Sequence, residues 1–516
     1  MVESIKHVVL KLVVCNAVLL TLGVTYSAPA QTNNPASTTA TEKWVVDQVV
    51  KGEDAHLETA FAVDDRKLSG SFIRKLLTNS IPGLKAGRHG VHVYGAVLTD
   101  PIDLRDEEIP YNFSLSDCVF EADVIFRNTH IRGDMNVDKS RFKRSVIFHD
   151  VDLEGTGFFS GTSFDDYVTF WGAHVTRHLV FENAQFNNAE REVDFQNAHI
   201  EMNAFFNNAV FKGPVDFRSA SIDKNAFFVG ATFEGFVTFN IAEIKKDFIV
   251  QSAQFKKAEP PDADFFGLKV GGNAVFSNSL FAAGLILTKA DVGGNVDLEN
   301  VRCPNETQAK TLAGLKADTI IFDNAQFAPP YYLNGMSYRL ISYNMDDQAL
   351  LSFVGKSDYK SDVYSTLESY YQRIGDVYAA RDVHVAGKDR ERDIAFSKSP
   401  LRSLWMWVQY ATMGYGKFLV RALLWSLVFI IVGCVIFWRE KGMETQDSDD
   451  AEKYSGRYHP IWYSLATFLP IVNLPDASIW TPKVDRKFAR FYLRLHIIFG
   501  YLLIPIGLAA WTGLIK

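Results

Sequence analysis

Residues 193–211 read VDFQNAHIEMNAFFNNAVF, and the fold of the chain can be inferred from the periodicity of this stretch. Large apolar residues stand at Phe195, Ile200, Phe206 and Phe211, so the spacing alternates between five and six residues. Neither the 3.6-residue period of a helix nor the alternation of a plain strand matches this spacing. The repeating unit is therefore eleven residues, which indicates a repeat architecture.

The same pattern extends along nearly half the chain. It runs without a break from Val93 to Phe186 and continues, with changes of phase, to Phe327. Phenylalanine is the most frequent anchor, which accounts for the 40 Phe in a chain of 516 residues. The phenylalanine anchors that we assign to the core are Phe120, Phe126, Phe142, Phe148, Phe164, Phe170, Phe181, Phe186, Phe206, Phe211, Phe217, Phe233, Phe239 and Phe255.

Small or β-branched residues stand two positions before many anchors, as Val193, Ala204 and Ala209 do. Residues two apart in an extended segment point to the same side, so each pair fills the inside of a coil. Turns between the pairs, supplied by residues such as Asn187-Asn188 and Asn207-Asn208, fold the chain into a stacked β-solenoid. We expect about ten coils at about 4.8 Å each, a rod on the order of 50 Å.

Interruptions of the pattern predict loops that leave the rod. They lie near residues 188–192, 257–263 and 304–319.

The repeat segment resembles pentapeptide-repeat proteins in their Phe- and Ala-rich, eleven-residue version. The resemblance implies a mainly β chain with a right-handed, quadrilateral β-solenoid over residues 93–327. Some members of that family mimic DNA and inhibit topoisomerases. Here the net charge of −7 argues against a nucleic-acid-binding surface, and an exported rod would not reach a cytosolic topoisomerase. We therefore expect no nucleic-acid partner.

Caps should close both ends of the solenoid, because its terminal coils expose apolar surface and unpaired edges. Residues 31–92 are predicted to be a linker and N-terminal cap, with Phe72, Leu76 and Leu77 on the inner face of one helix. Residues 328–400 are predicted to form a helical cap or hairpin. Its first helix should bury a stripe and end at Gly375, and Asp376 should cap the second helix. The predicted stripe consists of Tyr364, Leu367, Tyr371 and Ile374.

The N-terminus has the pattern of an export signal. Basic residues precede the apolar run 12–24, and Ala28-Pro29-Ala30 provides a site for cleavage. Residues 1–30 are therefore predicted to be a signal peptide, with an uncleaved anchor helix as the alternative.

The C-terminal residues 401–516 are predicted to be an α-helical membrane region. Apolar runs at 418–438 and 495–515 are long enough to span a bilayer, whereas 461–474 is short and suggests a re-entrant segment. The basic residues of the loop 439–490 place that loop in the cytosol. We therefore expect an integral protein of a bacterial inner membrane, with the solenoid on the periplasmic side.

One short motif evokes an ion channel. The stretch SLWMWVQYATMGYGKF, residues 403–418, resembles the pore helix and filter of potassium channels, with Thr412, Gly414, Tyr415 and Gly416 as the filter-like residues. The motif precedes the first predicted span, so the alternative is a turn at the membrane surface in which the glycines free the backbone.

Most of the chain resembles a family of uncharacterised bacterial membrane proteins with pentapeptide-like repeats and a two-span, channel-like region. The shared stretches are FIRKLLTN at 72–79, YYQRIGDVYAARDV at 370–383, GYGKFLVRALLW at 414–425 and YSLATFLPIVNL at 463–474. This resemblance implies no particular activity.

Motifs for catalysis, metal binding or cofactor binding are absent from the sequence. Asp165-Asp166 should be solvated turn residues, and His174 and His178 lack companion ligands in sequence. The sequence thus predicts no catalytic residue, no metal site and no cofactor.

The function expected is a membrane-anchored, non-enzymatic scaffold that presents the rod in the cell envelope. Its partners would be the lipid bilayer, an envelope protein or glycan, and like chains. The first alternative is a channel-like or mechanosensitive membrane protein with a degenerate pore, and the second is a carbohydrate-active enzyme on a β-helix.

Overall fold

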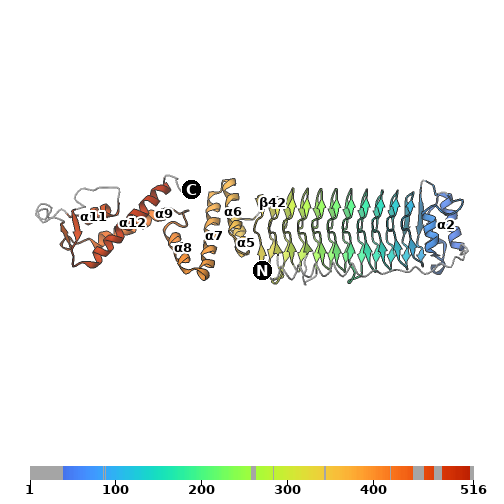
Figure 1. Ribbon diagram of the computed structural model, residues 1–516, viewed down its shortest axis with the longest axis horizontal. Helices are drawn as coiled ribbons and strands as arrows, with labels where there is room; N and C mark the ends of the chain where they lie inside the picture. Colours follow the sequence, from blue (N-terminus) through green and yellow to red (C-terminus); the bar gives the residue numbers. More distant parts are fainter. Residues whose placement is uncertain are drawn as a thin grey trace.

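The computed structural model describes residues 39–511, apart from 85, 88, 257–262, 283, 309, 342–344, 419, 446–457 and 470–478. The molecule is elongated, with strands stacked along much of its length, α2 at one end and the helices that follow the solenoid beyond the other end (Figure 1). The predicted signal peptide lies outside the described residues. So do residues 470–474 of the predicted segment 461–474 and residues 512–515 of the predicted span 495–515.

One coil of the rod contains four short strands. In a central coil these are β22 (His199–Ile200), β23 (Ala204–Phe205), β24 (Val210–Phe211) and β25 (Val215–Asp216). Each pairs in parallel with a strand of the next coil, and equivalent residues in a regular coil are 22 positions apart. Four strands per coil are the sides of the predicted quadrilateral, and each coil holds two of the predicted eleven-residue units.

The β-solenoid has about eleven turns and extends beyond both predicted boundaries. Before residue 93, β1 (Ala55–His56) and β2 (Lys67–Leu68) pair with the first predicted coil. After residue 327, β44 (Tyr331–Tyr332) and β45 (Ser337–Ile341) pair with the preceding coil. The strands before residue 93 do not carry the five-and-six spacing of anchors, so the periodicity does not reveal them. After Phe327 the spacing continues through buried Leu333 and Tyr338, so ending the solenoid at residue 327 was wrong.

Stacked aromatic rings form the core of the rod. The fourteen phenylalanines assigned to the core are all buried. In one column the ring centroids of Phe186 and Phe211 lie 4.6 Å apart, and those of Phe211 and Phe233 lie 5.1 Å apart. In another, Phe195 and Phe217 lie 4.7 Å apart. The rings stack at the spacing of hydrogen-bonded strands, so backbone pairing and ring packing support the same register.

A left-handed residue recurs every eleven positions at the corners of the coils. Asn197, Asn208, Ser219 and Gly230 have φ values of 56°, 55°, 55° and 67°. Asparagine and glycine tolerate this conformation, which explains the Asn-rich positions of the repeat. Ile241 occupies the next equivalent corner with φ of 52°, although β-branched residues disfavour it.

The interruptions of the repeat lie along one edge of the rod. At three places the coil is lengthened between a strand of the 12-stranded sheet and the following strand of the 11-stranded sheet. The first two places correspond to the predicted loops, although residues 257–262 lie outside the described part. The predicted loop 304–319 was too long, because β41 (Lys310–Thr311) and the start of β42 (Lys316–Ile321) pair with the preceding coil. The widened registers are Val168–Val193, Val237–Ala263 and Leu285–Lys310.

Helices α2 (Ala40–Lys51) and α4 (Gly70–Leu77) close the N-terminal end (Figure 1). Thr39 begins α2 with a capping box, in which its side chain accepts from the Glu42 N–H. Phe72, Leu76 and Leu77 of α4 are buried, as predicted.

Three helices follow the solenoid: α5 (Asp347–Lys356), α6 (Ser361–Ile374) and α7 (Val377–Lys398). Gly375, with φ of 84°, ends α6, and the Asp376 side chain caps α7, as predicted. Tyr364, Leu367 and Tyr371 are buried. Placing Ile374 in the same stripe was wrong, because it is the last residue of α6 and is exposed at the helix end.

The C-terminal part contains α8 (Pro400–Met413), α9 (Val420–Ile436), α11 (Pro460–Phe468) and α12 (Lys487–Trp511). A two-stranded antiparallel sheet, β46 (Met443–Thr445) with β47 (Trp480–Pro482), accompanies them. Helices α9, α11 and α12 pack against one another.

Among the described helices, one segment is long and apolar enough to cross a membrane. This segment is Lys487–Pro505 of α12, and the judgement rests on length and composition. The predicted span 418–438 contains α9, whose 17 residues fall short of the roughly 20 that a span needs. The structure therefore provides one candidate span where the sequence predicts two.

Candidate functional site

The outer faces of the rod carry ion pairs between coils. His174 lies 2.9 Å from Asp152 and 3.0 Å from Glu201, which belong to the preceding and following coils. Burial lowers the pKa of His174, but hydrogen bonds with these two carboxylates outweigh that effect and raise it. Asp165 accepts a hydrogen bond from Arg141 at 2.7 Å. These residues are paired surface groups, and no local spacing could reveal partners one coil away.

A cluster of three acidic residues lies at the edge of the rod that carries the loops. Asp216 is buried and pairs with Arg218 at 2.5 Å, and Glu192 and Asp194 belong to the coil before it. Burial, together with Asp216 and Asp194, raises the pKa of Glu192 to about 7. Across the described part of the chain, no group of three or more His, Cys, Asp or Glu has an arrangement that could hold a metal ion.

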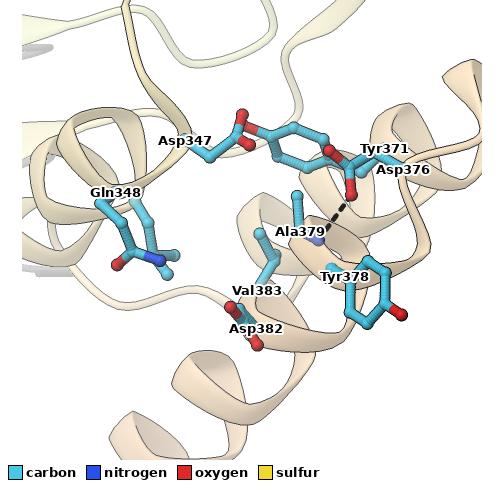
Figure 2. A pocket seen from close by; sticks show the side chains of 9 residues that line it. Asp347, Gln348, Tyr371, Asp376, Tyr378, Ala379, Asp382 and Val383 are labelled. Carbon is cyan, nitrogen blue, oxygen red and sulfur yellow. Dashed lines mark hydrogen bonds between the residues drawn. The ribbon is translucent and has the colours of Figure 1, made fainter.

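An acidic hollow lies where α5 meets the start of α7. Figure 2 shows Asp347, Asp376 and Asp382 around this hollow, which has a volume of about 210 Å³. Asp347 accepts from the Tyr371 hydroxyl at 2.8 Å, and Asp376 accepts from the N–H of Ala379 at 2.9 Å. Both carboxylates therefore serve the helix packing, and the lining residues include no Ser, Cys, Lys or His that could act as nucleophile or base.

The most extensively built polar site joins α7 to α8. The Arg392 guanidinium donates to Asp389 at 2.6 Å and to the Tyr415 hydroxyl at 3.0 Å, and Tyr415 itself donates to Asp389 at 2.9 Å. The guanidinium lies 4.3 Å from the centroid of Trp407 and 5.6 Å from that of Tyr410. Arg392 also lies 3.3 Å from the exposed carboxylate of Asp393. Because only 11% of the Arg392 side chain is exposed, this cation depends on these carboxylates and its aromatic rings.

A second ionic group strengthens the same junction. Lys417 lies 3.0 Å from Glu368 of α6, and His384 of α7 lies 2.9 Å from the same carboxylate. Burial raises the pKa of Glu368, but hydrogen bonds from His384 and Lys417 outweigh burial and hold it below its ordinary value. We call the residues Glu368, His384, Asp389, Arg392, Tyr415 and Lys417 the polar junction.

Of the filter-like residues, Tyr415 belongs to the polar junction. Gly414, Tyr415 and Gly416 have φ values of 52°, 57° and 89°, and they form the turn that ends α8. The Gly414 N–H donates to the carbonyl of Tyr410 at 2.9 Å, and Thr412 donates to the carbonyl of Val408 within α8. The motif therefore forms a helix-ending turn, with its tyrosine bound to α7.

Helices α9, α11 and α12 enclose a small polar centre. Ser464 donates to the carbonyl of Ile430 at 2.8 Å, and Nε2 of the fully buried His496 lies 2.9 Å from the carbonyl of Ser464. Nδ1 of His496 has no hydrogen-bond partner among the described residues. The absence of a side chain at Gly433 allows Ser464 to approach α9 closely, because a Cβ at this position would lie 2.3 Å from Oγ of Ser464.

The stacked columns of two-residue strands define a β-solenoid. The model of a family described as Pentapeptide repeats (9 copies) matches residues 195–240. The chain thus contains a pentapeptide-repeat domain that forms a β-solenoid, followed by an α-helical C-terminal region. Comparison with curated proteins and with solved structures gives no match.

Proposed function

We propose that this chain is a membrane-anchored, non-enzymatic scaffold of the bacterial cell envelope. In this proposal it is a two-span protein of the inner membrane, and its pentapeptide-repeat rod lies on the periplasmic side. The rod would bind an envelope protein or glycan, or assemble with like chains.

The polar junction is the observation that carries this proposal. It ties the helices that follow the rod to α8 and α9, whose apolar side chains face outward. Exposed Val420, Leu424 and Val435 of α9 and exposed Phe491 and Ile498 of α12 favour contact with lipid over contact with water. A rigid rod fixed to such helices would be held at a defined angle to a bilayer.

Thiol labelling tests the location of the rod. Lys256 is exposed near Glu234, at 3.6 Å, whereas Cys118 and Cys303 are buried, and burial raises the pKa of the Cys118 thiol to about 12. In a chain with Cys434 replaced by alanine, Lys256→Cys should react with a membrane-impermeant maleimide on intact spheroplasts. The matched variant Lys441→Cys, in the loop expected to be cytosolic, should react only once the spheroplasts have been lysed. The reverse pattern would refute the orientation.

Crosslinking tests the scaffold role. Photoreactive residues placed along the loop-bearing edge, beginning at exposed Glu190, should capture a specific envelope protein, a glycan or a second copy of the chain. Recovery of no specific product from any of these positions would count against a scaffold.

The buried His496 favours a second candidate, a channel-like membrane protein. Ionisable residues within membrane-spanning bundles often mark ion pathways. Purified protein in planar bilayers would then conduct, and His496→Ala would alter the current. Electrical silence of the wild-type chain would remove this candidate.

A further inference from the structure

Helix α8 presents an apolar stripe that nothing in the described part of the chain covers. Leu401, Leu404, Trp405 and Val408 are 81%, 61%, 60% and 42% exposed, and they recur at the spacing of one helix face. On other sides of α8, Ser403 and Met406 are buried, and Trp407 lies under the Arg392 guanidinium. The polar junction therefore fixes the rotation of α8 so that its most apolar face points away from the protein.

The stripe continues onto the first turns of α9. Trp425 of α9 donates its indole N–H to the carbonyl of Ala411 in α8 at 2.9 Å, which fastens the two helices. Val420, Leu424 and Val428 are each 46% to 68% exposed. A helix with an apolar face and tryptophan at its boundary is typical of segments that lie in the headgroup layer of a bilayer.

A hollow with one charged wall lies between α8 and α9. Ala411, Arg421, Leu424, Trp425 and Val428 line it, and its volume is about 210 Å³. Four of these five residues are apolar, so the interior of the hollow suits a hydrocarbon chain.

Arg421 provides the charge of this hollow. Its guanidinium lies 5.1 Å from the Tyr410 centroid and 4.7 Å from the Phe418 centroid, and it donates to the Tyr410 carbonyl at 3.1 Å. No carboxylate of the described residues forms an ion pair with it, in contrast to Arg392, Arg402 and Lys417. The remaining N–H groups of a guanidinium suit a phosphate, which arginine binds through paired hydrogen bonds.

We propose that α8 lies in the headgroup layer and that the hollow between α8 and α9 binds an anionic phospholipid. Arg421 would hold the lipid phosphate, and an acyl chain would lie along Leu424, Trp425 and Val428. The proposal rests on the proposed membrane anchoring and names the ligand at that anchor. Charge complementarity and the continuity of the apolar surface from α8 to α9 favour lipid over a protein partner.

The position of α8 is tested with a fluorescent probe in the full chain reconstituted into nanodiscs. In the Cys434→Ala background, an environment-sensitive label on Leu404→Cys should shift its emission to the blue and be quenched by lipids carrying interfacial nitroxides. The same label on Lys356→Cys, exposed on α5, should behave as in water. An aqueous signal at position 404, while the protein resists a carbonate wash, overturns the inference and leaves the anchoring intact. Removal of the protein by the wash refutes the anchoring itself.

The lipid site is tested by native mass spectrometry of the same full-length protein. Wild type should retain phosphatidylglycerol at least tenfold more tightly than phosphatidylcholine, and Arg421→Gln should lose this preference. Arg439→Gln, which removes an exposed cation beyond the other end of α9, should keep it. Equal retention of both lipids by wild type, or an unchanged preference in Arg421→Gln, would overturn the site. Displacement of the lipid by inorganic phosphate alone would also overturn it, because the acyl chain would then contribute nothing.

Discussion

Replacement of Phe206 by alanine probes the stacked core where it is most complete. The side chain is fully buried, and its ring lies 5.2 Å from Phe181 and 4.8 Å from Phe228 in the same column. Phe195 and Phe217 contact it edge-on at 5.4 and 5.5 Å. Removal of a buried phenylalanine ring costs about 3–5 kcal/mol. Since the four surrounding rings are themselves buried and leave little room for collapse, we expect about 4 kcal/mol.

Phe205 provides the matched control, because it is adjacent in sequence and points outward. It is half-buried, and its ring contacts Phe227 at 5.1 Å on the outer face of β23. Its replacement by alanine leaves no cavity, so we expect a loss of about 1 kcal/mol from surface contact and stacking. The free energy of unfolding would be measured for both variants by urea denaturation in detergent, followed by the circular dichroism of the β-solenoid.

A reversed order, or equal losses for the two variants, would refute the assignment of inward and outward positions. A one-residue shift of register exchanges the two faces of a strand, so this pair of variants is sensitive to that error. A loss below about 1 kcal/mol for Phe206→Ala would instead refute the argument that stacked rings hold the coils together.

Three further predictions concern a corner of the rod and the polar junction. Ile241→Asn should raise the free energy of unfolding by about 1 kcal/mol, because asparagine suits the left-handed conformation that exposed Ile241 adopts, whereas Ile241→Val should give no gain in the same urea assay. Arg392→Lys keeps the charge but loses the planar guanidinium between Asp389 and the aromatic rings, so it should lower the free energy of unfolding by about 2 kcal/mol and speed hydrogen exchange in α8. The control Arg402→Lys, at an exposed ion pair, should exchange as wild type does. Equal exchange in all three proteins would contradict the role of Arg392. Glu368 has a pKa below its ordinary value of 4.5, so its contribution is complete above that pH and is lost as the pH falls through the lower value in the folded state. Protection factors in α6 and α7, which are hydrogen-exchange rates corrected for the intrinsic pH dependence, should therefore fall in acid in wild type, and a Glu368→Gln variant that shows the same fall would contradict the assignment.

The periodicity of the sequence predicts the solenoid because each anchor acts locally. The residues two apart in Ala204-Phe205-Phe206 share a side of an extended segment, whatever the rest of the chain does. The cap helix with Phe72, Leu76 and Leu77 is predictable for the same reason, since one helix face suffices to specify it. Ile374 shows the limit of this reasoning. It fits the helical period of α6, yet it is the last residue of that helix and its side chain is exposed.

The polar junction is beyond the reach of the sequence, because its members come from different helices. Glu368, His384 and Lys417 meet at one carboxylate although they lie on α6, on α7 and after α8. The stretch around Tyr415 resembles a filter, and only the tertiary structure shows its hydroxyl bound to Asp389 and Arg392.

The amino-acid sequence is sufficient to predict the repeat, its eleven-residue unit, the inward phenylalanines and the succession of rod, hairpin and apolar C-terminal helices. Each of these follows from residue spacing or from the length of an apolar run, which are local properties of the chain. Three features become visible in the folded chain: the loops share one edge, the rod begins at β1, and α8 turns its apolar stripe outward. These features depend on contacts between residues that are far apart in the sequence, such as Tyr415 and Arg392. The spacing of residues within one segment does not reveal which distant residues they contact.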